Sequence, residues 1–395
     1  MISEKMYELG SKRSTIREAF EFGRRRAAEI GAEKVYDFTL GNPSIPAPAR
    51  VNQVIADMLQ QEDPVLIHGY TSAPGDAGVR QIIAEDLNHR FATGFKADNL
   101  YMTAGAAASL CIGLKALAEP GDEFIVIAPY FPEYHCFVES MGGTLVVVPA
   151  QPEDFQINFA ALERLISPRT KAVIINSPNN PSGAVYSEET IRQLSSLLNI
   201  KQQQYEHSIF LISDEPYREI VFDGAVVPFL PNYYQNTLIS YSYSKSLSLP
   251  GERIGYILVP DEVEDSSRVY AAVAGAGRAL GYVCAPSLFQ RVIARCIHEV
   301  ADVSIYERNR DMFYGELINL GYQCVKPGGA FYLFPRSLEA DAVSFCERAK
   351  RYDLLMVPGD DFGCPGHVRL AYCVQPKQIE RSLPAFGRLA QEYLG

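Results

Sequence analysis

The sequence predicts an α/β protein with a mostly parallel, seven-stranded sheet flanked by helices. Three observations support this class: seven short apolar runs recur along the chain, helical stretches alternate with them, and the composition is that of a globular protein. The runs start near residues 101, 123, 144, 171, 209, 237 and 254 and read YMT, EFIVIA, TLVVVP, KAVIIN, IFLIS, TLIS and IGYILV. This rhythm of strand and helix is typical of parallel sheets covered by helices.

Length, net charge and the distribution of apolar residues indicate the domain count and exclude some classes of partner. The chain has 395 residues, 47% of them hydrophobic and 21% charged, which suits two domains around a large buried core. A formal net charge of -11 argues against nucleic acid as a partner. The N-terminal MISEKMYELGSKRST has scattered charges, and nowhere do about 18 apolar residues run together. We therefore expect a cytoplasmic protein that does not bind membranes.

The eight cysteines are widely spaced along the chain. None forms a C-x-x-C pair, so neither a zinc site nor a disulfide framework is indicated. We expect reduced thiols, most of them in the core, and no bound metal.

The pattern of elements predicts two domains. Residues 14–30 combine a serine or threonine start with apolar residues at helical spacing, which predicts an amphipathic N-terminal helix. From residue 287 the pattern changes to long helical segments, followed by GGAFYLFP, another helix and VRLAYCV. We assign residues 46–286 to a large domain, and residues 1–45 with 287–395 to a smaller α+β domain.

Unusual residues follow the apolar runs, where the carboxyl ends of parallel strands form a ligand crevice. After the run at 101, TAGAAAS places Gly105, Ala106 and Ala107 at a helix start, where free N–H groups can bind an anion. Small residues there also suit simple helix packing. After the run at 123, PYFPEY supplies the aromatic Phe131, for which packing at the rim is the alternative. After the run at 171, SPNNPSG places Asn180 in a turn.

The next two runs end in charged groups. Asp214 and Glu215 follow the run at 209. A carboxylate directly after a buried strand needs a partner, because it is costly to desolvate alone. A helix N-cap is the alternative for Asp214. The run at 237 leads into YSYSKSLSLPGERIGY, which presents Lys245 with Arg253 eight residues later. Partial burial near positive groups lowers the pKa of a lysine and makes its amine nucleophilic. One ligand suits all five features, namely a pyridine aldehyde that carries a phosphate.

With these motifs in this order, the chain resembles the fold-type I, class I/II aminotransferases of the aspartate and aromatic type. These enzymes depend on pyridoxal 5′-phosphate. The resemblance covers nearly the whole chain, and its most specific signal is S-x-x-K followed by an arginine eight residues on. It implies that Lys245 forms the Schiff base and that Ser242 and Arg253 bind the phosphate. Ala106 and Ala107 lie in the phosphate turn with Gly105, so their contacts would come from backbone N–H groups.

The resemblance also implies how the ring of the cofactor is held. Asp214, in D-x-x-Y, resembles the partner of the pyridinium nitrogen. Tyr217 and Asn180, the latter in N-P-x-G, resemble the pair that binds the phenolic oxygen. Phe131 falls where the family stacks an aromatic side chain on the ring. Tyr70, in HGYTSAPG, resembles the tyrosine that reaches the phosphate of a neighbouring subunit, which implies a homodimer; a packed loop tyrosine is the alternative.

For the substrate, Arg369 in GHVRLAY resembles the arginine that clamps the α-carboxylate. Gly41, in LGNPS, matches the loop that closes over this group, and the resemblance also implies Asn180 as a substrate-binding residue. Arg278 lies roughly where other members supply an arginine from the partner subunit, with a surface arginine as the alternative. Ala107 stands where some members have a lysine for acidic substrates.

The implied reaction is a ping-pong transfer of an amino group, through an aldimine on Lys245, from an L-amino acid to a 2-oxo acid. Lys245 moves the proton, and Asp214 and Tyr217 support the ring. The closest alternative is a C–S β-lyase with the same cofactor residues, and the remote one is a non-catalytic ligand-binding protein. The sequence leaves the substrate open, with Tyr282 and Tyr332 as expected wall residues for aromatic amino acids.

Overall fold

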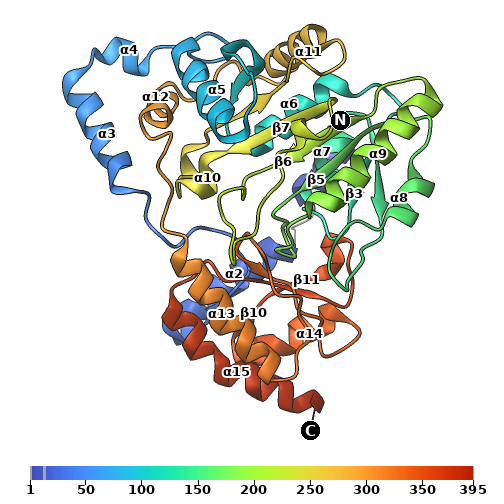
Figure 1. Ribbon diagram of the computed structural model, residues 1–395. Helices are drawn as coiled ribbons and strands as arrows, with labels where there is room; N and C mark the ends of the chain where they lie inside the picture. Colours follow the sequence, from blue (N-terminus) through green and yellow to red (C-terminus); the bar gives the residue numbers. More distant parts are fainter. Residues whose placement is uncertain (1, 12–14, 395) are drawn as a thin grey trace.

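The computed structural model describes residues 2–11 and 15–394. Two lobes lie one above the other in Figure 1, with the large sheet in the upper lobe and the C-terminal helices in the lower one. Ser14, predicted to begin the N-terminal helix, lies outside the described residues, and α2 covers Thr15–Ile30. Within the described ranges, no helix is both long and apolar enough to span a bilayer.

The seven apolar runs all form strands of one sheet, whose order is β2-β8-β7-β6-β5-β3-β4. In chain order these strands are β2 (Leu100–Thr103), β3 (Glu123–Ile127), β4 (Thr144–Val148), β5 (Thr170–Asn176), β6 (Phe210–Asp214), β7 (Thr237–Ser242) and β8 (Gly255–Leu258). Only β8 runs against its two neighbours in this sheet, because it pairs antiparallel with β2 and β7. The other pairings are parallel, which confirms the predicted fold class.

Helices cover both faces of this sheet, so alternate residues of a strand enter different cores. On β3, Phe124 and Val126 pack in the core that includes α6 and α11, whereas Ile125 and Ile127 pack in the core that includes α8 and α9. The helices of these two layers are α6 (Ala106–Leu117), α7 (Glu133–Ser140) and α11 (Ser266–Ala279) on one face, and α8 (Phe159–Leu165) and α9 (Glu188–Tyr205) on the other.

A third group of helices lies beside the β2–β8–β7 side of the sheet. It consists of α3 (Ala49–Gln61), α4 (Pro64–His68), α5 (Ala77–Phe91) and α12 (Ser287–Arg295). Val292 and Ile293 of α12 belong to the same core as Leu100 of β2 and Ile239 of β7. The division at residue 286 stays a prediction, and this packing favours a boundary that follows α12.

The lower lobe is built from two small sheets and the helices packed around them. Its strands are β1 (Tyr36–Asp37) with β10 (Leu354–Leu355), and β11 (Val357–Pro358) with β12 (Val368–Ala371) and β9 (Tyr332–Leu333). Its helices α13 (Ser304–Asn319), α14 (Ala342–Ala349) and α15 (Pro376–Leu394) enclose a core rich in aromatic rings, such as Phe38, Phe313 and Phe386.

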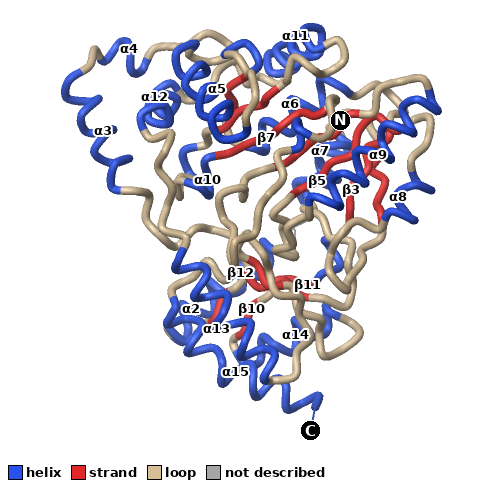
Figure 2. Tube along the Cα trace, in the orientation of Figure 1, coloured by secondary structure: helices blue, strands red, loops and turns tan. Residues whose placement is uncertain are grey.

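The N-terminal segment touches both lobes. In α1 (Glu4–Ser11), the amine of Lys5 donates a 3.0 Å hydrogen bond to the carbonyl of Glu139 on α7. In α2, Arg26 forms a 2.8 Å ion pair with Asp353 of the lower lobe. Figure 2 shows loops passing between the sheet and the lower lobe, and the turn α10 (Tyr243–Ser246) ends β7 beside this region.

Candidate active site

A cavity of 310 Å³ lies where the carboxyl ends of β5, β6 and β7 meet the lower lobe. Such an edge is the expected place for a ligand in a parallel α/β sheet. Most of the residues singled out in the sequence line it. They are Gly41, Ala106, Ala107, Phe131, Asn180, Asp214, Tyr217, Ser242, Lys245, Arg253, Tyr332 and Arg369.

Lys245 enters this cavity from α10, a single helical turn. The hydroxyl of Ser242 accepts a 3.1 Å hydrogen bond from the N–H of Ser244 and so caps the turn. The amine of Lys245 donates to the carbonyl of Gly41 at 2.8 Å. Burial lowers the pKa of this amine to about 8, with Arg253 among the groups that add to the shift. A large fraction of the amine is therefore neutral and nucleophilic near that pH.

Asp214, the last residue of β6, is buried on the same cavity. Its Oδ2 accepts a 2.6 Å hydrogen bond from the hydroxyl of Tyr134, and its Oδ1 has no partner in the described part of the chain. Burial raises the pKa of this carboxyl to about 7, against the opposing effect of the Tyr134 hydrogen bond. A buried oxygen without a partner is unfavourable, so Oδ1 is suited to a donor that a ligand brings.

A cradle for an anion lies at the start of α6. Gly105 has a φ of 81°, and a Cβ built on it would lie 2.7 Å from a guanidinium nitrogen of Arg253. Only glycine fits this turn, because it allows both the left-handed backbone and the close approach. The first N–H groups of the helix, from Ala106 and Ala107, have no partners within the helix and favour an anion. The hydroxyl of Ser244 lies 3.5 Å from Arg253 Nη1 at the same place.

Arg369 provides a second positive group at the other side of the cavity. It lies on β12 and is buried, and its hydrogen bonds in the described part of the chain go to an amide oxygen and a backbone carbonyl, not to a carboxylate. Its Nη1 donates to Asn180 Oδ1 at 3.1 Å and its Nη2 to the carbonyl of Thr39 at 2.5 Å, whereas Nε has no partner. The rings of Tyr332 and Phe362 lie 4.8 and 4.9 Å from its guanidinium carbon. Such a preorganised, unpaired guanidinium suits a carboxylate.

Aromatic side chains complete the walls. The hydroxyl of Tyr217 lies 2.9 Å from that of Tyr332, and burial raises the pKa of both phenols, to about 12 for Tyr332. Both therefore remain neutral hydrogen-bonding groups at physiological pH. Phe131 lines the cavity and packs edge-on against Tyr134 at a centroid distance of 5.6 Å. Gly41 approaches so closely that a Cβ there would overlap the hydroxyl of Tyr332.

Comparison with known proteins identifies the family. The family model described as "Aminotransferase class I and II" matches residues 33–386. The chain belongs to the class I and II aminotransferases. It is 31% identical to the aspartate/prephenate aminotransferase of Thermus thermophilus over 364 residues, which cover 89% of this chain and 90% of that protein.

Solved structures agree with this assignment. A crystal structure of an aminotransferase from Eubacterium rectale has a TM-score of 0.99 and 58% identity over 100% of both chains. The aspartate aminotransferase of Thermotoga maritima has a TM-score of 0.86 and 28% identity, covering 98% of this chain and 99% of that one. The chain is thus a fold-type I transaminase that uses pyridoxal 5′-phosphate, the cofactor of this family.

The aminotransferase cavity fits this cofactor by its donors and acceptors. The unpaired Asp214 Oδ1 matches a protonated ring nitrogen, and the α6 start with Arg253 matches a phosphate. The amine of Lys245 lines the same cavity and matches an aldehyde. Each of these groups was predicted from the residues that follow a strand.

Two predicted residues of the aminotransferase lie away from this cavity. The side chain of Tyr70 is 96% exposed on the loop after α4, and Arg278 is exposed near the end of α11. Neither lines the cavity of its own chain. Their predicted roles depend on a second subunit and stay predictions. Tyr282, expected as a wall residue, does not line this cavity either.

Sequence reasoning missed two residues that touch the site. Tyr134 donates to Asp214 across 80 positions, and only its place in the aromatic PYFPEY segment hinted at a role. Ser244 lines the cavity beside Arg253, although among the serines of this segment only Ser242 was predicted to bind the phosphate. The alternation of serines in YSYSK was the available signal, since residues two apart share a side of an extended segment.

Proposed function

We propose that this transaminase moves the amino group of an L-amino acid to a 2-oxo acid in a ping-pong reaction. One observation carries the proposal: the amine of Lys245, the unpaired Oδ1 of Asp214 and the unpaired Nε of Arg369 belong to residues of the same cavity. An amine, a carboxyl and a guanidinium in this arrangement match, respectively, a cofactor aldehyde, a ring nitrogen and a substrate carboxylate.

Each residue has a separate task in the proposed reaction. The bound cofactor supplies a carbonyl carbon for amines to attack and a ring that accepts electron density. Lys245, whose pKa burial lowers to about 8, would take a proton from the substrate Cα and deliver it to the former aldehyde carbon of the cofactor, on the other side of the transferred nitrogen. Asp214 holds a positive ring nitrogen, and Tyr217 with Asn180 offers polar groups to the ring oxygen.

Binding of the substrate carboxylate falls to Arg369. Asn180 and Thr39 fix its guanidinium, and the rings of Tyr332 and Phe362 pack on it, so its orientation is set before a substrate arrives. The carbonyl of Gly41 accepts a hydrogen bond from the amine of Lys245, so the loop that contains Gly41 lies against this amine. The cavity cations Lys245, Arg253 and Arg369 all have tasks, so an acidic substrate side chain requires another cation, for which we propose Arg278 of a second subunit.

We propose that the working unit is a homodimer. Val65 and Leu66 are 75% and 61% exposed beside the almost fully exposed Tyr70, on the α3–α4 arm at the side of the upper lobe. Apolar groups exposed together are suited to an interface. In this arrangement Tyr70 reaches the phosphate cradle of the second subunit. Sedimentation velocity should report a dimer for the wild type, and a monomer with full activity would contradict this.

We place the enzyme in the cytoplasm. All eight cysteines are free in the structure, and the eight include the half-exposed Cys111, Cys136 and Cys284. Free thiols at partly accessible positions are expected in a reducing compartment. Fluorescence of a tagged chain in fractionated cells checks the location.

A panel of amino acids tests the reaction. Each amino acid alone should yield its 2-oxo acid in an amount of at most about one per site, because a ping-pong enzyme stops after one half-reaction. Adding a 2-oxo acid acceptor should then sustain turnover. Release of ammonia and pyruvate from cystathionine, with no need for an acceptor, would instead show β-elimination. The named relatives are aminotransferases, which favours transfer.

A further inference from the structure

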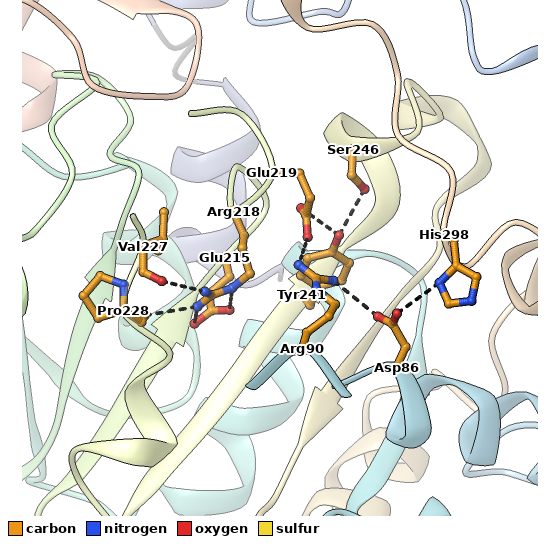
Figure 3. A network of polar contacts seen from close by, with 10 residues as sticks. All are labelled: Asp86, Arg90, Glu215, Arg218, Glu219, Val227, Pro228, Tyr241, Ser246 and His298. Atoms are coloured by element: carbon orange, nitrogen blue, oxygen red, sulfur yellow. Dashed lines mark hydrogen bonds and ion pairs between the residues drawn. The ribbon is translucent and has the colours of Figure 1, made fainter. Parts of the chain in front are cut away.

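A chain of polar contacts runs behind the helical turn that carries Lys245. Figure 3 shows it passing from Ser246 through Tyr241, Glu219 and Arg90 to Asp86 and His298. It lies along a cavity of 390 Å³ that Lys245 does not line, so it is separate from the cofactor cavity.

The contact nearest to the active site joins Tyr241 to the residue that follows Lys245. The hydroxyl of Tyr241 lies 3.1 Å from Ser246 Oγ and 2.9 Å from Glu219 Oε2. The phenol is placed to donate to both oxygens, and because it has one proton and the carboxylate is the stronger acceptor, the bond to Glu219 is the stronger of the two. Burial raises the pKa of Tyr241 well above its ordinary value, so the phenol keeps this proton at physiological pH.

The part of this series of polar contacts that is farthest from Ser246 involves Arg90 and Asp86 of α5. Arg90 Nη2 lies 3.0 Å from Glu219 Oε1, and Arg90 Nη1 lies 3.3 Å from Asp86 Oδ2. His298 Nδ1 lies 3.4 Å from Asp86 Oδ1 at the exposed end. The side chains of Glu219 and Asp86 are 10% and 9% exposed, so these ion pairs are shielded from solvent more than ordinary surface pairs.

The turn α10 depends on such outside support. It has four residues, and an isolated turn of that length has no stability of its own in water. Its last residue, Ser246, is held twice: its carbonyl accepts a 2.7 Å hydrogen bond from the N–H of Ala301, and its hydroxyl contacts Tyr241. The position of Lys245 on this turn is thereby tied to β7, to α5 and to the segment after α12.

We propose that Tyr241 and Glu219 are positioning residues, which hold the turn bearing Lys245 in register with the bound cofactor. Neither touches the cofactor cavity, so they act through Ser246. A reacting group displaced by about 1 Å loses up to about 100-fold in rate. This role goes beyond the proposed amino-group transfer, because it concerns how the lysine meets the cofactor, whichever substrate follows.

The test compares Tyr241→Phe with Tyr243→Phe. Tyr243 packs on Tyr241 in the same ring cluster, with centroids 5.0 Å apart, but no hydrogen bond of its hydroxyl is found in the described part of the chain. Visible circular dichroism per bound cofactor reports the geometry of the cofactor on Lys245 without any substrate. We expect it to fall by about half or more in Tyr241→Phe, with about a tenfold loss of kcat and a KM within about twofold of wild type. Tyr243→Phe should match the wild type in all three.

Two further variants separate positioning from folding. Glu219→Gln keeps an acceptor for Tyr241 but weakens the pairing with Arg90, so an intermediate loss of dichroism is expected. Ser246→Thr keeps the hydroxyl and should retain the wild-type signal, whereas Ser246→Ala should behave like Tyr241→Phe. A lower melting temperature with unchanged dichroism and kcat in Tyr241→Phe would overturn the proposal. If the wild type binds cofactor but transfers no amino group, the dichroism still decides the matter.

Discussion

Residues 214–219, at the end of β6 and just beyond it, have two sides, which differ in how completely their polar groups are paired. Asp214 and Tyr217 line the cofactor cavity, where Asp214 Oδ1 has no partner among the residues that the structure describes. Glu215, Arg218 and Glu219 are held on the other side, as Figure 3 shows, and each has hydrogen-bond or ion-pair partners. Unpaired buried groups are unfavourable, so the side with the unpaired Asp214 is where we expect a ligand to bind. The side whose polar groups are all paired holds the segment in place.

We expect the greatest loss of activity when the amine of Lys245 is removed from the cofactor cavity. Lys245→Ala should lower kcat by about 1,000-fold or more and abolish the visible band of the bound cofactor, because Lys245 brings the amine into the cavity. The melting temperature should change little, since the amine makes one hydrogen bond, to Gly41. The control Lys171→Ala removes a lysine that pairs with Asp122 at the opposite end of the sheet and should keep full turnover. Wild-type turnover in Lys245→Ala would contradict its role.

The next effect concerns the stability of the cofactor-free protein. Burial raises the pKa of Asp214 to about 7, whereas an unfolded aspartate titrates near about 3.9. The native state therefore keeps a proton that the unfolded chain releases, and the free energy of unfolding falls as pH rises through this window, by at most about 4 kcal/mol.

Urea unfolding of the cofactor-free protein at about pH 5 and about pH 8 measures this fall. Comparison with Asp214→Asn isolates one carboxyl, because all other titrating groups are shared. The wild type should lose more stability than the variant between the two pH values. Equal losses would show that Asp214 ionises as an ordinary carboxyl.

On the side whose polar groups are all paired, Glu215→Gln should destabilise the fold. Glu215 and Arg218 form an ion pair whose side chains are 1% and 4% exposed, and Arg218 also contacts the carbonyls of Val227 and Pro228. Removing one charge leaves the other buried and unpaired, which costs about 3 kcal/mol. In the control Glu188→Gln, the partner Arg192 is 66% exposed, and the change should stay below about 0.5 kcal/mol. Urea unfolding of both variants measures the difference; similar values would contradict it.

The smallest of these effects is expected at the substrate clamp. Arg369→Lys keeps a positive charge but loses the planar fork, so KM for the preferred amino acid should rise about 30-fold with a smaller change in kcat. Steady-state kinetics with the panel substrate measures both constants. Arg268→Lys, at an 85% exposed position, should leave them unchanged. An unaltered KM in Arg369→Lys would show that Arg369 does not bind the substrate carboxylate.

Much of the fold was predictable because buried strands leave a simple signal. Continuous apolar runs located all seven strands of the large sheet, and most of the residues that line the cavity follow one of them. The order of the strands and the reversed direction of β8 have no such local signal, since they depend on which strands pair in space. The packing of α12 against the upper lobe was hidden for the same reason.

The contacts that hold the site residues in place could not be predicted from local sequence patterns either. Tyr134 meets Asp214, and Tyr241 meets Glu219, across 80 and 22 positions, and nothing in either neighbourhood specifies the partner. Tyr70 and Arg278 show a further limit, because their predicted targets belong to another subunit. Motif spacing thus finds groups that meet a ligand, whereas the groups that hold them in place emerge from packing.

We expect the cofactor to be bonded covalently to the amine of Lys245. Borohydride fixes such a bond irreversibly, and peptide mass spectrometry then locates the added pyridoxyl group. We expect the added mass on the peptide that contains Lys245, in a yield of about one per chain. The same mass on another lysine, or no added mass in protein that retains full activity, would contradict it.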